Sequence, residues 1–129
     1  MSAAVVLDSS AAIALLRNEP GAEVVADYIG RAAISAVNLQ ELVKSLALRG
    51  LEPAVIGEIV AELRLDVHPH DQDAAFAAGL LVKATERYGS GIGDRSCMAL
   101  AVELGVPVLT TDREWAEVQV EGLSARIIR

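Results

Sequence analysis

The sequence predicts an α/β fold with a mainly parallel central sheet of about five strands, formed by residues 1–129 as a single domain. Short apolar runs alternate with longer segments of helical periodicity, and this alternation is typical of β-α-β units. The 129 residues are 53% hydrophobic, which is enough to bury a core. Only 3% are aromatic, so we expect a core of Ala, Val, Leu and Ile.

The expected elements follow one another in a regular order. The strands are Ala4–Leu7, Ala33–Ser35, Asp66–His68, Pro107–Thr110 and Ala125–Ile128. The helices are Ser10–Arg17, Gly21–Ile29, Val37–Arg49, Pro53–Leu63, Asp71–Tyr88, Asp94–Leu104 and a short Arg113–Ala116.

Glycine and proline mark several of these boundaries. Pro20 and Gly21 separate the first two helices. Gly50 suits the position just after the end of the third helix, and Pro53 suits the first turn of the fourth. Pro107 follows the last long helix and leads into the fourth strand.

Composition excludes several classes of protein. The single Cys97 excludes an internal disulfide and a multi-cysteine metal site, and we expect it to pack as a small hydrophobic side chain. A net charge of −7 argues against a broad basic surface for nucleic acid. No apolar run approaches the roughly 20 residues of a membrane span, and no signal peptide is recognisable. We therefore expect a cytoplasmic protein without a membrane partner.

Four carboxylates stand where apolar elements end or helices begin: Asp8, Glu41, Asp94 and Asp112. Ligands of open parallel sheets bind beyond the carboxyl ends of the strands, which is where Asp8 and Asp112 are expected. Clustered carboxylates oppose one another's ionisation unless a counter-charge is present. The usual counter-charge is a hard divalent cation with oxygen ligands.

Each acid also has a purely structural interpretation. Asp8, Asp94 and Asp112 could each cap the helix that follows. Glu41 lies roughly opposite the main apolar stripe of its helix, and local sequence favours a solvated side chain that pairs with Lys44.

Four motifs resemble those of PIN-domain proteins, in the right order and spacing. They are Val5–Leu16 followed by Glu19–Gly21, then Ser35–Glu41, Gly93–Ala101 and Val108–Trp115. The compact length is similar to that of VapC-type toxins, which belong to type II toxin–antitoxin pairs. The resemblance implies a three-layer α/β/α PIN-like fold.

The resemblance further implies a ribonuclease site that depends on Mg²⁺ or Mn²⁺. The catalytic acids would be Asp8, Glu41, Asp94 and Asp112, with Asp8, Asp94 and Asp112 as metal ligands. It implies supporting roles for Thr110, Asn38 and Ser9. It also overturns the local interpretation of Glu41 as solvated.

The expected partners follow from charge and from this resemblance. Too few aromatic residues are present for a single-strand stacking platform, which favours a structured RNA such as a tRNA or rRNA loop. We expect a VapB-like antitoxin whose basic tail enters the acidic site. We also expect a homodimer that buries Val37–Arg49 and Pro53–Leu63.

Two other functions remain open at this point. A PIN scaffold without catalytic activity would act as a binding module, although the four acids are intact. A phosphoacceptor signalling domain would need a pair of adjacent acids after the first strand, where only Asp8 is present.

Overall fold

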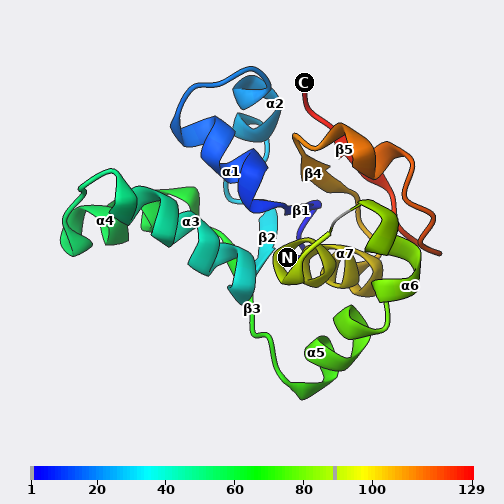
Figure 1. Cartoon of the computed structure of the whole chain (residues 1–129). Coiled ribbons are helices and arrows are strands. Elements are labelled where there is room, and N and C mark those ends of the chain that lie inside the picture. The colour runs from blue at the N-terminus through cyan, green and yellow to red at the C-terminus, as the bar shows by residue number, and fades with distance from the viewer. Residues whose placement is uncertain (1, 89) are drawn as a thin grey trace.

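A single five-stranded parallel sheet forms the centre of the molecule. The computed structural model describes residues 2–88 and 90–129 (Figure 1). The strands are β1 (Val5–Leu7), β2 (Ala32–Ser35), β3 (Asp66–His68), β4 (Val108–Thr110) and β5 (Ala125–Ile127). Their order is β3-β2-β1-β4-β5, and every neighbouring pair is parallel. The predicted fold class and the five strand positions are confirmed.

Helices fill the connections between these strands. They are α1 (Ser9–Leu16), α2 (Ala22–Ala26), α3 (Ala36–Leu48), α4 (Pro53–Leu63), α5 (Gln72–Gly79), α6 (Val82–Thr85) and α7 (Ile92–Leu104). Two short 3₁₀ helices, η1 (Glu86–Tyr88) and η2 (Arg113–Ala116), complete the described elements.

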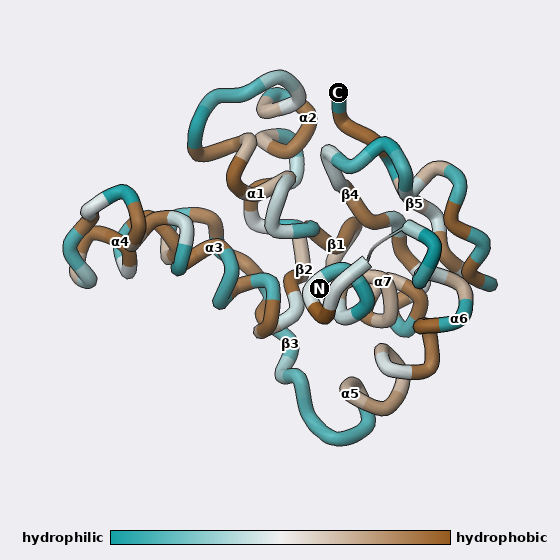
Figure 2. Tube along the Cα trace, in the orientation of Figure 1, coloured by the Kyte–Doolittle hydropathy of each residue, from teal (hydrophilic) through white to brown (hydrophobic). Residues whose placement is uncertain are grey.

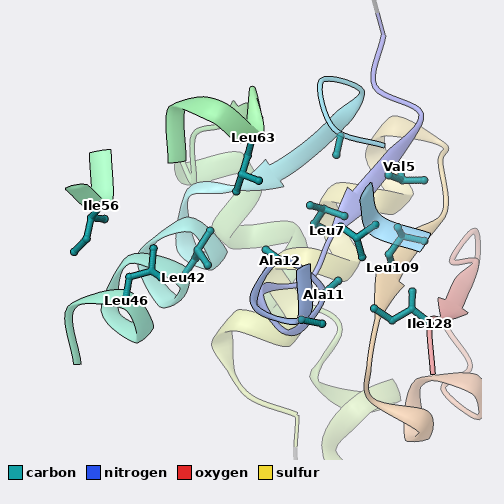
Figure 3. Packing of buried hydrophobic residues seen from close by; sticks show 13 residues of the cluster. Val5, Leu7, Ala11, Ala12, Leu42, Leu46, Ile56, Leu63, Leu109 and Ile128 are labelled. Atoms are coloured by element: carbon teal, nitrogen blue, oxygen red, sulfur yellow. The ribbon is translucent and has the colours of Figure 1, made fainter. Parts of the chain in front are cut away.

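The central strands bury both faces, which explains why they are continuously apolar. Successive side chains point to opposite faces of a strand. Val5 and Leu7 therefore join the cluster under α1 to α4, which Figure 3 shows. Val6 joins a second cluster with Cys97 and Met98 of α7. The sheet thus lies between two helical layers, as expected, and Cys97 packs as a buried hydrophobic side chain.

Helices α3 and α4 lie side by side and extend away from the sheet (Figure 1). Leu42 and Leu46 of α3 and Ile56 and Leu63 of α4 belong to the same buried cluster (Figure 3). Figure 2 shows hydrophobic residues along this helical pair and hydrophilic residues in the loop between β3 and α5.

The prediction of one continuous helix over Asp71–Tyr88 is wrong. The segment divides into α5, α6 and η1, with α5 ending at Gly79. Glycine is a poor helix former, which favours the end of α5 at Gly79. In the next short helix the hydroxyl of Thr85 donates to the carbonyl oxygen of Leu81 at 2.8 Å. Thr85 is buried, and Leu81 packs against the α7 cluster. Burying this turn takes precedence over continuing the helix.

Helix α7 begins two residues earlier than predicted, at Ile92 instead of Asp94. Asp94 therefore lies inside the first turn. No described helix is both long enough and apolar enough to cross a membrane.

Candidate functional site

The carboxyl ends of β1 and β4 form the floor of the candidate site. The two strands are adjacent and parallel, with Leu7 opposite Leu109. The backbone N–H of Asp8 donates to the carbonyl oxygen of Leu109 at 3.0 Å. Asp8 and Thr110 therefore emerge at the same edge of the sheet, as the strand pattern predicts.

Asp8 is a buried carboxylate held by two hydroxyl groups. The residue is only 5% exposed. Oδ2 accepts hydrogen bonds from Ser10 Oγ at 2.7 Å and from Thr110 Oγ1 at 2.8 Å. Burial raises the pKa of Asp8 from 3.8 to about 6, although the two hydroxyl donors oppose this shift. The negative charges of Asp94 and Glu41 raise it further.

Thr110 connects Asp8 to Asp112. Its hydroxyl oxygen accepts the backbone N–H of Asp112 at 3.1 Å while its proton goes to Asp8. Asp112 Oδ1 accepts the N–H of Glu114 at 3.0 Å and caps η2. The capping interpretation of Asp112 is therefore correct, but its carboxylate still acts on the site, because its charge raises the pKa of Asp94.

Asp94, in the first turn of α7, likewise both caps its helix and contributes a charge to the site. Its Oδ2 accepts the backbone N–H of Gly91 at 3.2 Å. Partial burial raises the pKa of Asp94, and the charges of Asp112 and Glu41 add to this effect. The Gly91 N–H and the Arg95 guanidinium act in the opposite direction.

Glu41 is half-buried and is hydrogen-bonded to other residues of the site. Its Oε1 accepts Ser9 Oγ at 3.0 Å and Asn38 Nδ2 at 2.9 Å. Asn38 is fully buried and also donates to the carbonyl oxygen of Gly93 at 3.1 Å. The described residues include no ion pair between Glu41 and Lys44. The local interpretation of Glu41 is therefore wrong, and the alternative that followed from the motif resemblance agrees with this geometry.

All seven predicted site residues lie around one point of the sheet edge. Their hydrogen bonds link α1, α3, β4 and the first turn of α7. Sequence reasoning did not assign Ser10, which bonds Asp8 and also accepts the backbone N–H of Thr111 at 3.1 Å. Its position two residues after Asp8, at the start of a helix, is the signal that could have identified it.

The donor atoms suit a hard divalent cation, because they are carboxylate, hydroxyl and amide oxygens. The Oδ1 atom of Asn38 is buried and has no hydrogen-bond partner among the described residues. In the arrangement seen here, no three His, Cys, Asp or Glu side chains of residues 2–88 and 90–129 are grouped to hold a metal ion. The chemistry of the donor set therefore fits a cation, while the geometry requires the carboxylates to move closer together.

Comparisons with known proteins agree with this architecture. Residues 5–121 match the family model described as PIN domain. The fold is similar to DNA-bound VapBC from Salmonella typhimurium, with a TM-score of 0.73, 24% identity and 100% of each chain covered. It is also similar to VapBC2 from Rickettsia felis, with a TM-score of 0.71, 16% identity and coverage of 95% of this chain and 97% of that one.

A third similar structure is VapBC-5 from Mycobacterium tuberculosis, with a TM-score of 0.55, 25% identity and 98% of each chain covered. The search of curated proteins gives no match. The family match spans nearly the whole chain, and the fold and motif order agree with it. The chain therefore belongs to the PIN domain family.

Proposed function

We propose that this protein is a metal-dependent endoribonuclease, the VapC-type toxin of a type II toxin–antitoxin pair. One observation carries the proposal: carboxylates from four separate segments lie at the carboxyl edge of a PIN-domain sheet, where burial and the charges of neighbouring carboxylates raise the pKa of Asp8 and of Asp94. Carboxylates that lie close together repel one another, which costs free energy. Helix capping would not require these four acids to be near one another, so capping alone does not explain why they are grouped. The similarity to VapBC structures supports the toxin assignment.

Asp8, Asp94 and Asp112 are the residues that would hold Mg²⁺ or Mn²⁺. When bound, the cation would neutralise part of the carboxylate charge, attract the RNA phosphate and activate water. Asp8 is fixed by Ser10 and Thr110, so the other two acids would approach it. Asp112 is exposed and Asp94 is only half-buried, which leaves both side chains room to adjust.

Glu41 would either join the ligand set or orient the attacking water. Both of its observed hydrogen bonds, from Ser9 and Asn38, are to Oε1. Oε2 packs against the backbone of Gly93 but accepts no hydrogen bond from the described residues, so it is the oxygen that would be available to a metal ion or a water molecule. In this proposal Ser9, Asn38 and Thr110 hold the reacting acids in place and take no direct part in cleavage.

The substrate class in this proposal is a structured RNA, of the tRNA or rRNA kind. The described aromatic side chains offer no stacking platform, because Trp115 is buried and Phe76 lies apart on α5. Recognition would rest on backbone shape and on arginines at the rim, such as Arg95 beside Asp94 and the exposed Arg113 beside Asp112.

A VapB-like antitoxin is the proposed inhibitor. An apolar groove of about 690 Å³ lies between the ends of α1, α3 and α4. Its lining consists of Leu15, Leu16, Ile29, Leu46, Arg49, Leu51, Ile59, Glu62 and Leu63. A second, more polar groove shares Arg49 and leads to Ser9 and Glu41. A partner segment with apolar anchors followed by a basic residue would fit this path.

The test is cleavage of a folded tRNA pool with and without divalent cations. We expect cleavage with Mg²⁺ or Mn²⁺, none in EDTA, and a loss of at least about 10²-fold in Asp8→Asn and Asp94→Asn. Glu62→Gln, on the exposed side of α4, is the charge-matched control and should cleave like the wild type. Cleavage that persists in EDTA or in both Asn variants would falsify the metal–carboxylate mechanism. A folded, metal-binding protein that cleaves no RNA would favour a binding module.

A further inference from the structure

Gly93 lies directly against the carboxylate of Glu41. A Cβ atom built on Gly93 would be 2.5 Å from Glu41 Oε2, 2.6 Å from Oε1 and 2.7 Å from Cδ. These separations are shorter than non-bonded atoms tolerate, so the carboxylate occupies the space that any other residue type would need for its side chain.

The backbone at position 93 does not itself require glycine. Gly93 is helical, and it is not among the glycines with a positive φ, which are Gly21, Gly30, Gly50, Gly105 and Gly122. A glycine inside a helix is destabilising by about 0.5–1 kcal/mol relative to alanine. The space left for Glu41 explains why this position lacks a side chain.

Asn38 bonds both partners of the contact between Glu41 and Gly93. Its Nδ2 donates both to Glu41 Oε1, at 2.9 Å, and to the carbonyl oxygen of Gly93, at 3.1 Å. Ser9 holds the same Oε1 at 3.0 Å. Glu41 is thus confined between the start of α1, its own helix and the first turn of α7.

We propose that Gly93 is a positioning residue for Glu41. Because Gly93 has no side chain, the Glu41 carboxylate packs against the backbone of α7 and is held beside Asp94. This inference rests on the proposed function, because the position matters only if Glu41 takes part in the site. Asp94 is the next residue in the chain, so the same helical turn fixes the place of both acids. A side chain at position 93 moves Glu41 and leaves the rest of the fold intact, since the atoms in its way are the end of a flexible side chain.

Gly93→Ala is the direct test, and the chain supplies matched controls. Gly57 in α4 and Gly79 in α5 are also helical, and a Cβ at either meets nothing within 4 Å. We expect Gly57→Ala and Gly79→Ala to keep wild-type Mn²⁺ affinity and RNA cleavage. Gly93→Ala should remain folded, bind Mn²⁺ about 10-fold more weakly or worse, and lose kcat with little change in KM for RNA.

Shortening Glu41 provides a rescue. Glu41→Asp alone withdraws the carboxylate from Ser9 and Asn38 and leaves the space above Gly93 vacant. In Gly93→Ala/Glu41→Asp the added methyl group occupies that space, so the loss of Mn²⁺ affinity should be smaller than the product of the two single losses. Multiplicative losses would mean that the two positions act independently and would overturn the inference.

A measurement without metal separates this inference from the proposed function. The chain contains two asparagines, Asn18 and Asn38, so selective ¹⁵N labelling of asparagine gives two pairs of side-chain NH₂ signals, which Asn18→Asp assigns. In EDTA, Gly93→Ala should shift the Asn38 amide, and Gly57→Ala should not. If wild-type protein cleaves no RNA, the proposed function fails while this shift still reports the contact. An unshifted Asn38 amide with unchanged Mn²⁺ affinity in Gly93→Ala would reject the role of Gly93.

Discussion

The hydroxyl of Thr110 donates a 2.8 Å hydrogen bond to Oδ2 of Asp8, although the two residues are 102 positions apart in the sequence. The bond joins the carboxyl ends of two neighbouring parallel strands. Thr110 is fully buried and also accepts the N–H of Asp112. One hydroxyl therefore fixes the deepest carboxylate of the site and the loop that carries its most exposed one.

Replacing Thr110 with valine keeps the shape of the side chain and removes this hydroxyl. Because the Thr110 hydroxyl favours the ionised form of Asp8, its loss should raise the pKa of Asp8 further. We expect RNA cleavage to fall about 10- to 100-fold, and its acid limb to move to higher pH. The free energy of unfolding should fall by about 1–2 kcal/mol, since the N–H of Asp112 loses its acceptor.

Thr111→Val is the matched control for this prediction. Thr111 is the next residue, is only partly buried, and contributes its backbone N–H, which the substitution keeps, to the bond with Ser10. Its activity and pH profile should match those of the wild type. Equal effects of the two substitutions would mean that the hydroxyl of Thr110 has no particular role.

The sheet and the strand-end acids could be predicted from sequence because both depend on local patterns. Apolar runs of three or four residues, each followed by a helix, define parallel strands, and their order places Asp8 and Asp112 at one edge. Glu41 could not be assigned from its own helix. Its partner Ser9 lies 32 positions away, and the first turn of α7 lies further along the chain. A helical-wheel projection of α3 shows neither of these contacts.

The division of residues 71–88 was not predictable for a related reason. The segment has helical composition throughout, and one glycine, Gly79, does not by itself end a helix. The break accompanies the burial of Thr85 and the packing of Leu81 against the cluster that includes α7, and the packing of Leu81 is a tertiary contact. Local propensity and tertiary burial conflict there, and burial determines the outcome.

The proposed antitoxin tail should bind less tightly as salt increases. Its basic residue would reach Glu41 and Asp8 past the polar groove, and charges at a rim are screened over about 8 Å at physiological ionic strength. Titration calorimetry of the tail peptide at low and high salt measures this effect. An Asp8→Ala/Asp94→Ala variant that binds the peptide as tightly as wild type would remove the electrostatic part of the proposal.

A homodimer should form, and its face can be identified by substitution. Phe76, on α5, and Leu80, the residue that follows its last turn, are 69% and 67% exposed and are four positions apart. The sequence favoured α3 and α4, where Leu48 and Val55 are exposed, but that pair also borders the groove proposed for the antitoxin. We therefore expect Phe76→Ser/Leu80→Ser to convert the dimer to a monomer in sedimentation experiments.

Leu48→Ser/Val55→Ser is the companion variant for the dimer experiment and should stay dimeric. The reverse result would assign the interface to α3 and α4. Wild-type protein that sediments as a monomer at micromolar concentration, without antitoxin, would count against both faces.

Stability without metal should decrease as pH rises through the titration of Asp8. Its pKa in the folded protein is about 6, above the ordinary 3.8, so the folded state binds this proton more tightly than the unfolded state. The resulting stabilisation is complete below the unfolded pKa and is lost as pH rises through the folded one. Between pH 5 and pH 7.5 the loss should be about 1 kcal/mol.

Urea unfolding in EDTA should show this loss in wild type and a smaller one in Asp8→Asn, because asparagine does not titrate. Mn²⁺ affinity should change in the opposite direction, increasing over the same interval as Asp8 ionises. Identical pH dependence of unfolding in wild type and Asp8→Asn would show that the Asp8 carboxyl is not the group responsible.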